Sequence, residues 1–452
     1  MDVIREEARD VPVAAECDVC VIGGSCTGVF AAVCAARLGA DVVIVENNGF
    51  FGGVATAGLV CVWHSMFDTT QERRIIAGRT AEVIERLQRR DAVRIRPPDQ
   101  NRHCSFNSAE LIIELDELVK ETNVRPFLHA RFVAPVLRDG RLAAAVIEDK
   151  SGRRAIRASY FIDATGDGDV IARMGLPFRV DQELQPPTAC AIIRGLGELK
   201  RRDPAFDLAK AVFDKRFPNA LPDGFLWSTE VVGAHDDTMV AGTRINHADC
   251  ADADQLSLAE IEGRRQIRAM CDLLRENFGG GEAVTLAAVP AYIGIRETRH
   301  AECSHTLTES EALDGVRFPD AIANGSYRVD VHHSDKPGLT FRYLDGTEHY
   351  VQPNGPSVRG RWRDEIEEDP TFYQIPYASL VPKGATNVLV AGRLIDADKG
   401  AYGAIRVMVN CNQTGEAAGT AAYLALNGST SVADVAPRKL RETMRSQGAL
   451  II

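Results

Sequence analysis

The stretch Asp18-Val-Cys-Val-Ile-Gly-Gly-Ser-Cys-Thr-Gly28 decides the fold of this chain. An apolar strand at 18–22 runs directly into a glycine-rich loop, and a helix of small residues is expected at 29–38. Gly39 is expected to cap that helix, and a second strand, 41–45, ends at Glu46. A strand, a glycine loop, a helix and a second strand with a terminal carboxylate are typical of a dinucleotide-binding βαβ unit.

Each part of this unit has a physical role. Gly23 and Gly28 permit a tight turn and a close approach by a pyrophosphate, and the helix N-terminus offers free N–H groups. Glu46, roughly twenty residues further on, is placed to accept hydrogen bonds from ribose hydroxyls. Ser25 replaces the middle glycine of the usual G-x-G-x-x-G pattern. Because its hydroxyl can itself donate to a phosphate oxygen, we expect a shifted loop that still binds.

The composition is that of an ordinary globular chain. It has 452 residues, 45% of them hydrophobic and 25% charged, which is enough for about two or three domains. A net charge of −11 without a long basic run argues against nucleic acid as a partner. Residues 1–15 have no apolar signal-peptide core, and no segment approaches the roughly eighteen apolar residues of a membrane span. We therefore expect a cytoplasmic protein without a membrane partner.

The eleven cysteines are expected to be reduced thiols. Most of those in the N-terminal part lie in expected strands, the glycine loop or the first helix, as buried small apolar residues do. Cys17-x-x-Cys20 has redox spacing, but it leads into a strand and not into a helix N-terminus that would acidify a thiol. No spacing of His and Cys resembles a zinc site, so we predict no metal.

The rest of the first part mixes helices and strands. Helical apolar spacing occurs at 75–90 and 108–122, and strands are expected at 126–136, 142–148 and 155–162. We assign residues 1–170 to the first part of a cofactor-binding domain.

The middle of the chain differs in character. From 171 to 370, Pro-rich and charged stretches surround one amphipathic helix, 258–278, which predicts an inserted α+β substrate domain. A buried strand at 387–391 then leads into Gly392, and one long Ala- and Gly-rich helix, 405–426, is expected to pack closely against the sheet. Residues 371–452 are therefore predicted to complete the first domain.

Two features favour FAD over a nicotinamide cofactor. The nucleotide-binding pieces come from both ends of the chain, as a long cofactor requires. Only one phosphate loop is visible, because Phe278-Gly-Gly-Gly281 follows a helix and not a strand. The predicted fold class is α/β, with a discontinuous Rossmann-like FAD-binding domain that carries an inserted α+β domain.

Further motifs sharpen this prediction. They are Gly52-Gly-x-Ala-Thr-x-Gly-Leu59, Asp163-Ala-Thr-Gly-Asp-Gly168, Gly294-x-Arg-Glu-Thr-Arg299, Ala391-Gly-Arg-x-Ile-x-Ala397 and Gly403-x-Ile-Arg-Val-Met408. With these motifs the chain resembles the FAD-dependent oxidoreductases of the glutathione-reductase-type FAD-binding fold, from about residue 17 to 425. The resemblance implies FAD as cofactor, and family members differ in their substrates.

The resemblance also assigns residues to parts of FAD. Gly23, Gly28, Glu46, Gly52 and Gly53 would contact the ADP half, and Val133 would meet the adenine through its backbone. Gly166, Asp167 and Gly168 would line the pyrophosphate side, with Gly392 and Arg393 near the ribityl chain. Arg406 and Val407 would lie by the flavin pyrimidine, at the N-terminus of the last helix, where the helix dipole favours negative charge. Gly24, Ser25, Thr27, Asn47 and Ala164 complete the predicted cofactor contacts.

His64 is the first candidate for chemistry. It follows the glycine-rich loop expected beside the flavin, and a histidine there can take a proton from an alcohol or amine as hydride leaves, titrating near neutrality. The alternatives are a polar residue in a packed loop and a covalent flavin attachment. His64 lies beyond the position of a histidine attachment in fumarate-reductase relatives, so we expect non-covalent FAD.

Two other clusters contain candidate catalytic residues. Arg296 and Arg299 are three residues apart and suit a carboxylate or another anion, or else they form a structural network with Glu297. Asp330 and His332 lie on one face of an extended stretch and can pair as carboxylate and imidazole, for catalysis or for stray metal binding.

The predicted function is an FAD-dependent dehydrogenation of a small polar substrate at a C–OH or C–N bond, by hydride transfer to flavin N5. The electrons would pass to oxygen or to a separate acceptor. A flavin-dependent reductase of an activated C=C bond is the enzyme alternative, and a non-catalytic FAD-binding redox sensor is the alternative of another class. A homo-oligomer is compatible with the sequence.

Overall fold

The computed structural model describes residues 2–222, 224–353 and 355–452. Its main sheet has the strand order β6-β2-β1-β9-β8-β7, with β22 beside β9. β6, β2, β1, β9 and β22 run parallel, whereas β8 and β7 continue antiparallel from β9. The strands are β1 (Val13–Ile22), β2 (Val42–Val45), β6 (Arg125–Phe127), β7 (Arg131–Arg138), β8 (Arg141–Asp149), β9 (Gly152–Asp163) and β22 (Val388–Val390).

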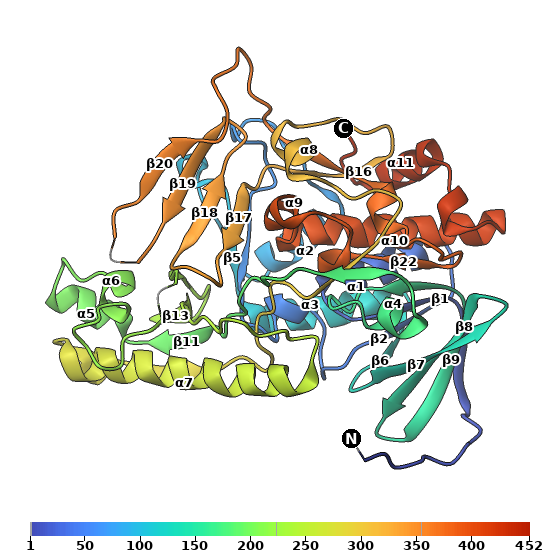
Figure 1. Ribbon diagram of the computed structural model, residues 1–452, viewed down its shortest axis with the longest axis horizontal. Helices are drawn as coiled ribbons and strands as arrows, with labels where there is room; N and C mark the ends of the chain where they lie inside the picture. The colour runs from blue at the N-terminus through green and yellow to red at the C-terminus, as the bar shows by residue number, and fades with distance from the viewer. Residues whose placement is uncertain (1, 223, 354) are drawn as a thin grey trace.

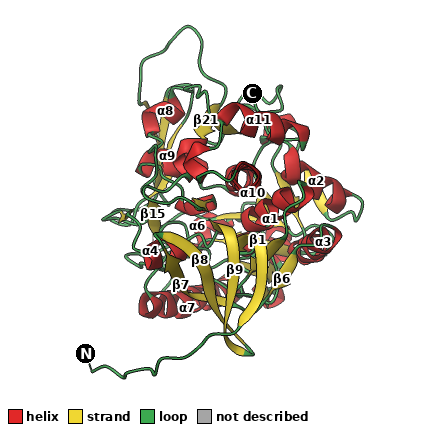
Figure 2. Ribbon diagram, turned by 90° about the vertical axis from the view of Figure 1, so that its right-hand side faces the viewer, coloured by secondary structure: helices red, strands yellow, loops and turns green. Residues whose placement is uncertain are grey.

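The alternation of side chains along β1 explains the layers around this sheet. Val19 and Val21 face a core that also contains α1 (Cys26–Arg37) and α10 (Met408–Gly428). Cys20 and Ile22 face the opposite core, beneath β7, β8 and α4 (Asp169–Met174). Figure 2 shows α1 and α10 together on one side of the strands. The predicted βαβ unit and α/β class are confirmed.

Glycines in α10 bring two helices into backbone contact. A Cβ at Gly415 would lie 2.1 Å from the carbonyl oxygen of Thr27, and one at Gly419 would lie 2.0 Å from that of Ala31. The small residues of α10 therefore pack closely against α1, and α10 also contacts the sheet, where the hydroxyl of Tyr160 on β9 donates to the carbonyl of Ala425.

The predicted long helix at 405–426 corresponds to α10, which begins three residues later than expected, at Met408. The structure has α9 (Lys399–Ile405) and α10, separated at Arg406 and Val407. Val407 is extended, with φ −67° and ψ 146°, and caps α10. A further helix, α11 (Pro437–Ser446), follows, so α10 is not the last helix.

The predicted strand 126–136 is also two strands. β6 extends the parallel edge next to β2, whereas β7 joins β8. His129, with φ +50°, turns the chain between them, and the N–H of Ala130 donates to the carbonyl of Glu46 at 3.0 Å. The carbonyl of Glu46 thus accepts from the turn between β6 and β7.

Segments around α1 complete the N-terminal part. α2 (Gly78–Gln88) and α3 (Ser108–Glu121) correspond to the two predicted helices. They flank a small sheet of β3 (Val62–Trp63), β4 (Val93–Ile95) and β5 (Cys104–Phe106). Asn107 caps α3 by accepting from Ala109 and Glu110 N–H groups.

The middle of the chain forms additional sheets. α7 (Ala253–Asn277) packs on the sheet β12-β13-β11-β14 with its own apolar core, and β17-β18-β19-β20 forms an antiparallel sheet (Figure 1). This confirms an additional domain with mixed helices and strands. The strands are β10 (Phe178–Val180), β11 (Ala191–Arg194), β12 (Trp227–Glu230), β13 (Asp237–Ala241), β14 (Thr285–Ala288), β15 (Arg299–Ala301), β16 (Ala321–Gly325), β17 (Val329–His332), β18 (Leu339–Arg342), β19 (Thr347–Val351), β20 (Val358–Arg361) and β21 (Tyr373–Pro376), and the short helices are α5 (Leu196–Arg202), α6 (Leu208–Val212) and α8 (Glu309–Leu313).

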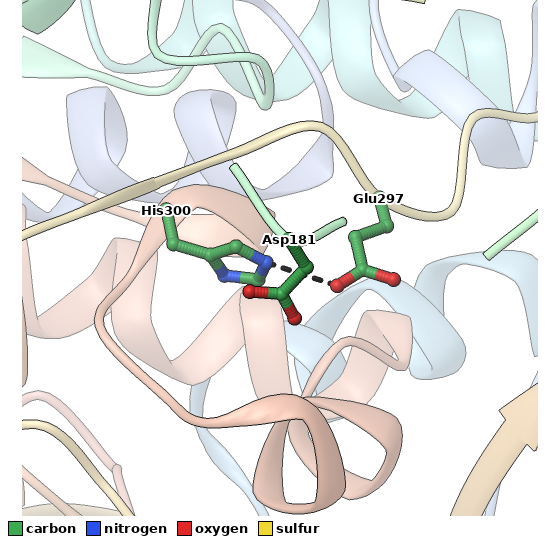
Figure 3. Close-up of side chains that lie close together, drawn as sticks. All are labelled: Asp181, Glu297 and His300. Carbon is green, nitrogen blue, oxygen red and sulfur yellow. Dashed lines mark hydrogen bonds and ion pairs between the residues drawn. The ribbon is translucent and has the colours of Figure 1, made fainter. Parts of the chain in front are cut away.

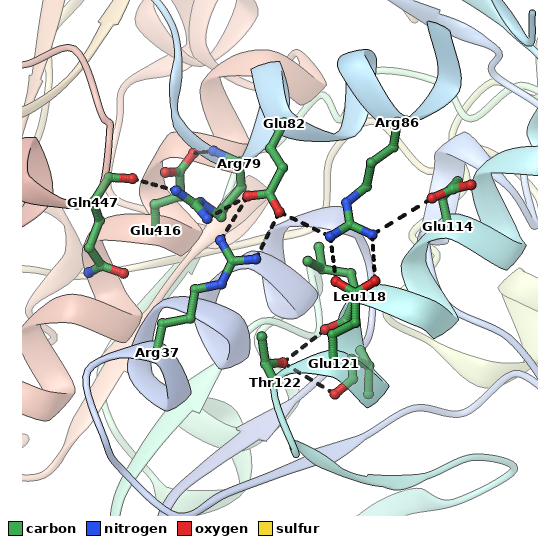
Figure 4. Close-up of polar contacts among 11 residues, drawn as sticks. Arg37, Arg79, Glu82, Arg86, Glu114, Leu118, Glu121, Thr122, Glu416 and Gln447 are labelled. Carbon is green, nitrogen blue, oxygen red and sulfur yellow. Dashed lines mark hydrogen bonds and ion pairs between the residues drawn. The ribbon is translucent and has the colours of Figure 1, made fainter. Parts of the chain in front are cut away.

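An ionic network ties α1, α2, α3 and α10 together (Figure 4). Glu82 on α2 pairs with Arg37, Arg79 and Arg86. Glu416 on α10 accepts from the backbone N–H of Arg79 at 3.0 Å and is buried. Burial raises the pKa of the Glu416 carboxyl to about 8, against the opposing charge of Arg79.

All eleven cysteines are free thiols, and burial, followed by the charge of Asp41, raises the pKa of the Cys17 thiol to about 12, so this thiol is not activated. Among the described residues, no helix combines the length and the apolar character that a membrane crossing requires.

Candidate active site

The glycine loop lies between β1 and α1. Gly23 has φ +107°, and a Cβ there would lie 2.2 Å from the carbonyl oxygen of Ala164, so only glycine fits. A Cβ at Gly28 would lie 1.8 Å from the carbonyl oxygen of Gly23. Ser25 caps α1 in an extended conformation without a side-chain capping bond. The loop therefore presents the N-terminus of α1, which suits a pyrophosphate.

Glu46 at the end of β2 is 6% exposed. Its Oε2 accepts from the N–H of Gly24 at 2.6 Å, and its Oε1 accepts from the N–H and Nδ2 of Asn48, both at 2.7 Å. Burial raises the pKa of this carboxyl, and the hydrogen bonds from Asn48 and Gly24 oppose that effect. A carboxylate has about four acceptor positions, so Glu46 retains capacity for a further donor.

A cleft of about 220 Å³ runs from this loop to the start of α10. Most of the predicted cofactor residues line it, and they come from both ends of the chain. The lining includes Gly23, Gly24, Ser25, Thr27, Glu46, Asn47, Gly52, Gly53, Ala164, Gly166, Asp167, Gly392, Arg393 and Arg406.

Four predicted cofactor residues lie outside this lining. Gly28 supports the loop, Gly168 caps α4 with φ +68°, and Val407 caps α10. Val133 follows the lining segment 130–132 in β7.

Other lining residues were not predicted. They lie within the quoted motifs or close to them, which is the signal that points to them, and they include Val54, Ala57, Gly58, Tyr292, Ile293, Ile295, Met408, Cys411 and Asn412.

The Asp163-Ala-Thr-Gly-Asp-Gly168 motif divides its two acids between different tasks. Asp163 is fully buried and accepts from Thr165 and from the N–H groups of Val170 and Ile171, so it fixes the turn into α4. Asp167 lines the cleft and pairs with Arg393 at 3.0 Å.

Arg393 reaches the cleft from the C-terminal part of the chain. A Cβ at Gly166 would lie 2.6 Å from its Nη2, so glycine permits this approach. Its buried Nη1 has no hydrogen-bond partner among the described residues. An unpaired buried donor beside the cleft suits an acceptor oxygen on a bound molecule.

Arg296 and Arg299 do not form the predicted paired anion site. Arg299 donates to the carbonyls of Asp167 and Ala251 and lies 3.5 Å from Asp169. Arg296 instead contacts the carbonyl of Pro186 and, at 2.6 Å, the hydroxyl of Thr188. The two guanidinium groups thus bind separate partners, and Arg299 holds the turn that follows Asp163.

The predicted carboxylate–imidazole pair is present. Nε2 of His332 lies 3.3 Å from Oδ1 of Asp330, and Oδ2 of Asp330 accepts from the hydroxyl of Tyr327 at 2.9 Å. Arg406, which lines the cleft, lies 3.4 Å from Oδ2. Gly403 allows this contact, because a Cβ there would lie 2.9 Å from the carbonyl oxygen of Asp330. We call Arg296, Tyr327, Arg328, Asp330, His332 and Arg406 the Asp330 cluster.

Burial and charge set the protonation of this pair. Burial alone would raise the pKa of Asp330, but His332, Arg406 and Arg328 outweigh it and hold the pKa below its usual range. Burial and the charge of Arg296 lower the pKa of His332 to about 3, so its imidazole is neutral. Nη2 of Arg244 lies 3.3 Å from Nδ1 of His332. Because arginine only donates, the contact assigns the proton of His332 to Nε2, facing Asp330.

His64 lies against the same cluster. Its ring stacks on Tyr327 with centroids 4.2 Å apart. Burial, followed by the charge of Arg328, lowers the pKa of His64 to about 3, which corrects the expectation of titration near neutrality. Its ring nitrogens form no hydrogen bond with the residues that the structure describes. A neutral imidazole of this kind can accept a proton.

The Arg296–Arg299 motif contributes a separate buried group (Figure 3). Nε2 of His300 lies 3.1 Å from Oε1 of Glu297. One side-chain atom of each of Asp181, Glu297 and His300 could ligate a metal ion, and these three atoms lie within 4.8 Å of one another. Burial and the nearby Glu297 raise the pKa of Asp181. Glu297 also accepts from the N–H of Gln185 at 2.9 Å. These contacts hold the irregular segment before β15 that carries Arg296.

The glycine loop, Glu46 and a cleft lined from both ends of the chain define an α/β dinucleotide-binding protein. Within that class, the family described as FAD dependent oxidoreductase matches residues 18–444. The chain belongs to that family, so it is an enzyme, its cofactor is FAD, and it acts on a small molecule together with an electron acceptor. No curated protein matches the chain significantly.

The site fits the cofactor of this family. The free helix N-terminus and the remaining acceptor capacity of Glu46 suit the pyrophosphate and a ribose. The unpaired Nη1 of Arg393 adds a donor from the other end of the chain.

Several solved structures are similar to this chain at a low level. A geranylgeranyl bacteriochlorophyll reductase-like protein from Thermoplasma acidophilum has 11% identity over 96% of this chain and 83% of its own, with a TM-score of 0.47. The p-nitrophenol 4-monooxygenase PnpA from Pseudomonas putida DLL-E4 has 11% identity over 96% and 88%, with a TM-score of 0.46. PqsL from P. aeruginosa, solved with 2-aminobenzoylacetate, has 12% identity over 96% and 93%, with a TM-score of 0.45. Likenesses at this level carry no argument about the reaction.

Proposed function

We propose that this enzyme dehydrogenates a small polar substrate at a C–OH or C–N bond. Arg406 carries the proposal, because it lines the cleft and also contacts Asp330 at 3.4 Å. This contact connects the cofactor cleft to a buried carboxylate–imidazole pair and to His64. FAD, when bound, supplies the hydride acceptor.

His64 is the proposed general base. Its neutral imidazole is available to accept the O–H or N–H proton as the substrate C–H bond breaks. His332 is proposed as a positioning residue, because its two ring nitrogens already face Asp330 and Arg244. Arg296 would keep this region cationic, and Arg299 would act only through the turn at Asp167.

The cofactor contacts remain part of this proposal. The lining residues of the cleft would touch FAD, with Glu46 on a ribose and Arg393 on the chain between the two ring systems. Gly28, Gly168 and Val407 would shape the backbone, and Val133 would lie next to the adenine segment. We also propose residues 171–370 as the inserted substrate domain, completed on either side by 1–170 and 371–452.

Reduction of an activated C=C bond is the second candidate function. The guanidinium groups of the Asp330 cluster favour it, since they can polarise an anionic substrate. A non-catalytic redox sensor is less well supported, because a sensor does not require His64 and the Asp330 cluster beside the cleft.

The test compares both directions of the reaction. The FAD-loaded protein is mixed anaerobically with hydroxy acids, amino acids, polyols and amines, and the oxidised flavin absorbance is followed. In parallel, dithionite-reduced protein is mixed with unsaturated acids and its reoxidation is followed. We expect a hydroxyl- or amino-bearing compound to bleach the flavin. Rapid reoxidation by an unsaturated acid, without bleaching by any compound of the first panel, would replace dehydrogenation by C=C reduction.

A further inference from the structure

Arg328 is a partly buried arginine, with a buried Nε, and has no anionic partner in contact among the described residues. Its guanidinium carbon lies 3.9 Å from the ring centroid of Phe341, 5.0 Å from that of Tyr327 and 5.8 Å from that of Tyr343. Among the described residues, no carboxylate lies within 4.0 Å of it, and its buried Nε has no hydrogen-bond partner. Burying a charge without a hydrogen-bonded partner is costly, so such a group suggests a ligand.

The neighbouring guanidinium groups add to the unpaired positive charge. Arg296 is held by a carbonyl and a hydroxyl, both neutral, and Arg406 contacts Asp330. Among the described residues, one ion pair involves these arginines, and it joins Arg406 to Asp330; Arg296 and Arg328 have none. Burial, followed by the charge of Arg406, lowers the pKa of Arg296 to about 9, against the opposing charge of Asp330. The region therefore favours an added negative charge.

Arg328 lies close to the groups that are proposed for catalysis. Its charge lowers the pKa of both His64, the proposed base, and Asp330, the neighbouring carboxylate. Aromatic rings around the guanidinium restrict hydrogen bonding to its edge, which is a planar fork of N–H donors. A planar carboxylate matches that fork in a bidentate way, better than a tetrahedral anion does.

We propose that Arg328, supported by Arg406, binds a substrate carboxylate, so that the substrate is a small hydroxy or amino acid. This rests on the proposed function for the bond that reacts, and on Arg328 for the carboxylate. His64, whose ring lies against that of Tyr327 beside Arg328, would then be close to the bound carboxylate and to the neighbouring hydroxyl or amino group.

The test uses anions that do not react. The FAD-loaded protein is titrated with acetate and malonate, with their neutral amides acetamide and malonamide, and with inorganic phosphate. Two readouts are followed, the change in flavin absorbance and the thermal midpoint of unfolding. Arg328→Gln is the variant. Arg317→Gln is the matched control, because Arg317 also stacks on a ring, that of Phe372 at 3.5 Å, but donates to a carbonyl outside the cluster.

We expect a carboxylate to perturb the flavin spectrum and raise the thermal midpoint, and the amides to do neither. Loss of charge-assisted hydrogen bonds should weaken carboxylate binding about ten- to a hundredfold in Arg328→Gln and leave it unchanged in Arg317→Gln.

Three results would overturn the proposal. They are equal carboxylate binding by both variants, tighter binding of phosphate than of any carboxylate, and no effect of any carboxylate on wild type. The dehydrogenation itself is judged separately. If neutral polyols bleach the flavin equally well in wild type and Arg328→Gln, the anion site is wrong and dehydrogenation stands. If carboxylates bind as expected but no hydroxy or amino acid bleaches the flavin, the anion site stands and dehydrogenation is wrong.

Discussion

Substituting Glu46 by Gln should weaken FAD binding strongly. The amide oxygen can keep the two hydrogen bonds from Asn48, but the amide nitrogen then faces the N–H of Gly24, now bonded to Oε2 at 2.6 Å. The variant loses a charge-assisted hydrogen bond, and its amide N–H₂ donor then opposes the N–H donor of Gly24 at the phosphate loop. Hydrogen bonds to charged groups contribute about 1.5–3 kcal/mol, so the dissociation constant should rise by about ten- to a hundredfold.

The assay is a fluorescence titration of the apoprotein with FAD at constant salt. Glu16→Gln is the control, because Glu16 lies on β1, the strand next to β2, in an exposed ion pair with Arg157 that contributes little. We expect the control to stay within about threefold of wild type. An affinity of Glu46→Gln inside that same range would refute the role of Glu46 in shaping the cofactor site.

Three further predictions follow from the same contacts. Acid precipitation should leave all flavin in the supernatant, because the site supplies hydrogen bonds from both ends of the chain, and a fluorescent flavopeptide in the pellet would contradict this. Burial and the charge of Arg328 lower the pKa of His64 to about 3, so its imidazole is neutral above about pH 5 and kcat/KM should show no ionisation near 6.5; an acidic limb there that disappears in His64→Ala would be the opposite result. Burial raises the pKa of Glu416 from 4.5 to about 8, so the folded state holds its proton over a range in which the unfolded state releases it. Stability of wild type should therefore fall as pH rises through that window, by about 1.4 kcal/mol per pH unit, and Glu416→Gln should lack this slope in urea unfolding; parallel pH profiles of the two proteins would disprove it.

The first βαβ unit was predictable because its signals are local. The apolar run, Gly23, the small helix residues and Glu46 lie within one continuous stretch. Each element depends mainly on its own residues and on glycine geometry, so the pattern alone was sufficient. The Asp330–His332 pair was predictable for the same reason, since alternation along one strand places both side chains on one face.

The helix break at Arg406 was not predictable from the local pattern. The break corresponds to a contact between Arg406 and Asp330, which is distant in sequence. Arg328 gave no signal, because a single arginine becomes distinctive only when Phe341 and Tyr343 surround it. The low pKa of His64 likewise depends on burial that only tertiary packing provides.

The central claim is that His64, beside the Asp330 cluster, removes the substrate proton during dehydrogenation. Stopped-flow mixing of FAD-loaded wild type, His64→Ala and His305→Ala with the hydroxy or amino acid that bleaches the flavin tests this claim most directly. His305 is a partly buried histidine bound to Glu311 and serves as the control. We expect His64→Ala to retain FAD and to slow bleaching by about 10²–10⁴-fold, with His305→Ala unchanged. Bleaching by His64→Ala within about threefold of wild type, a difference below roughly 1 kcal/mol, would contradict the claim.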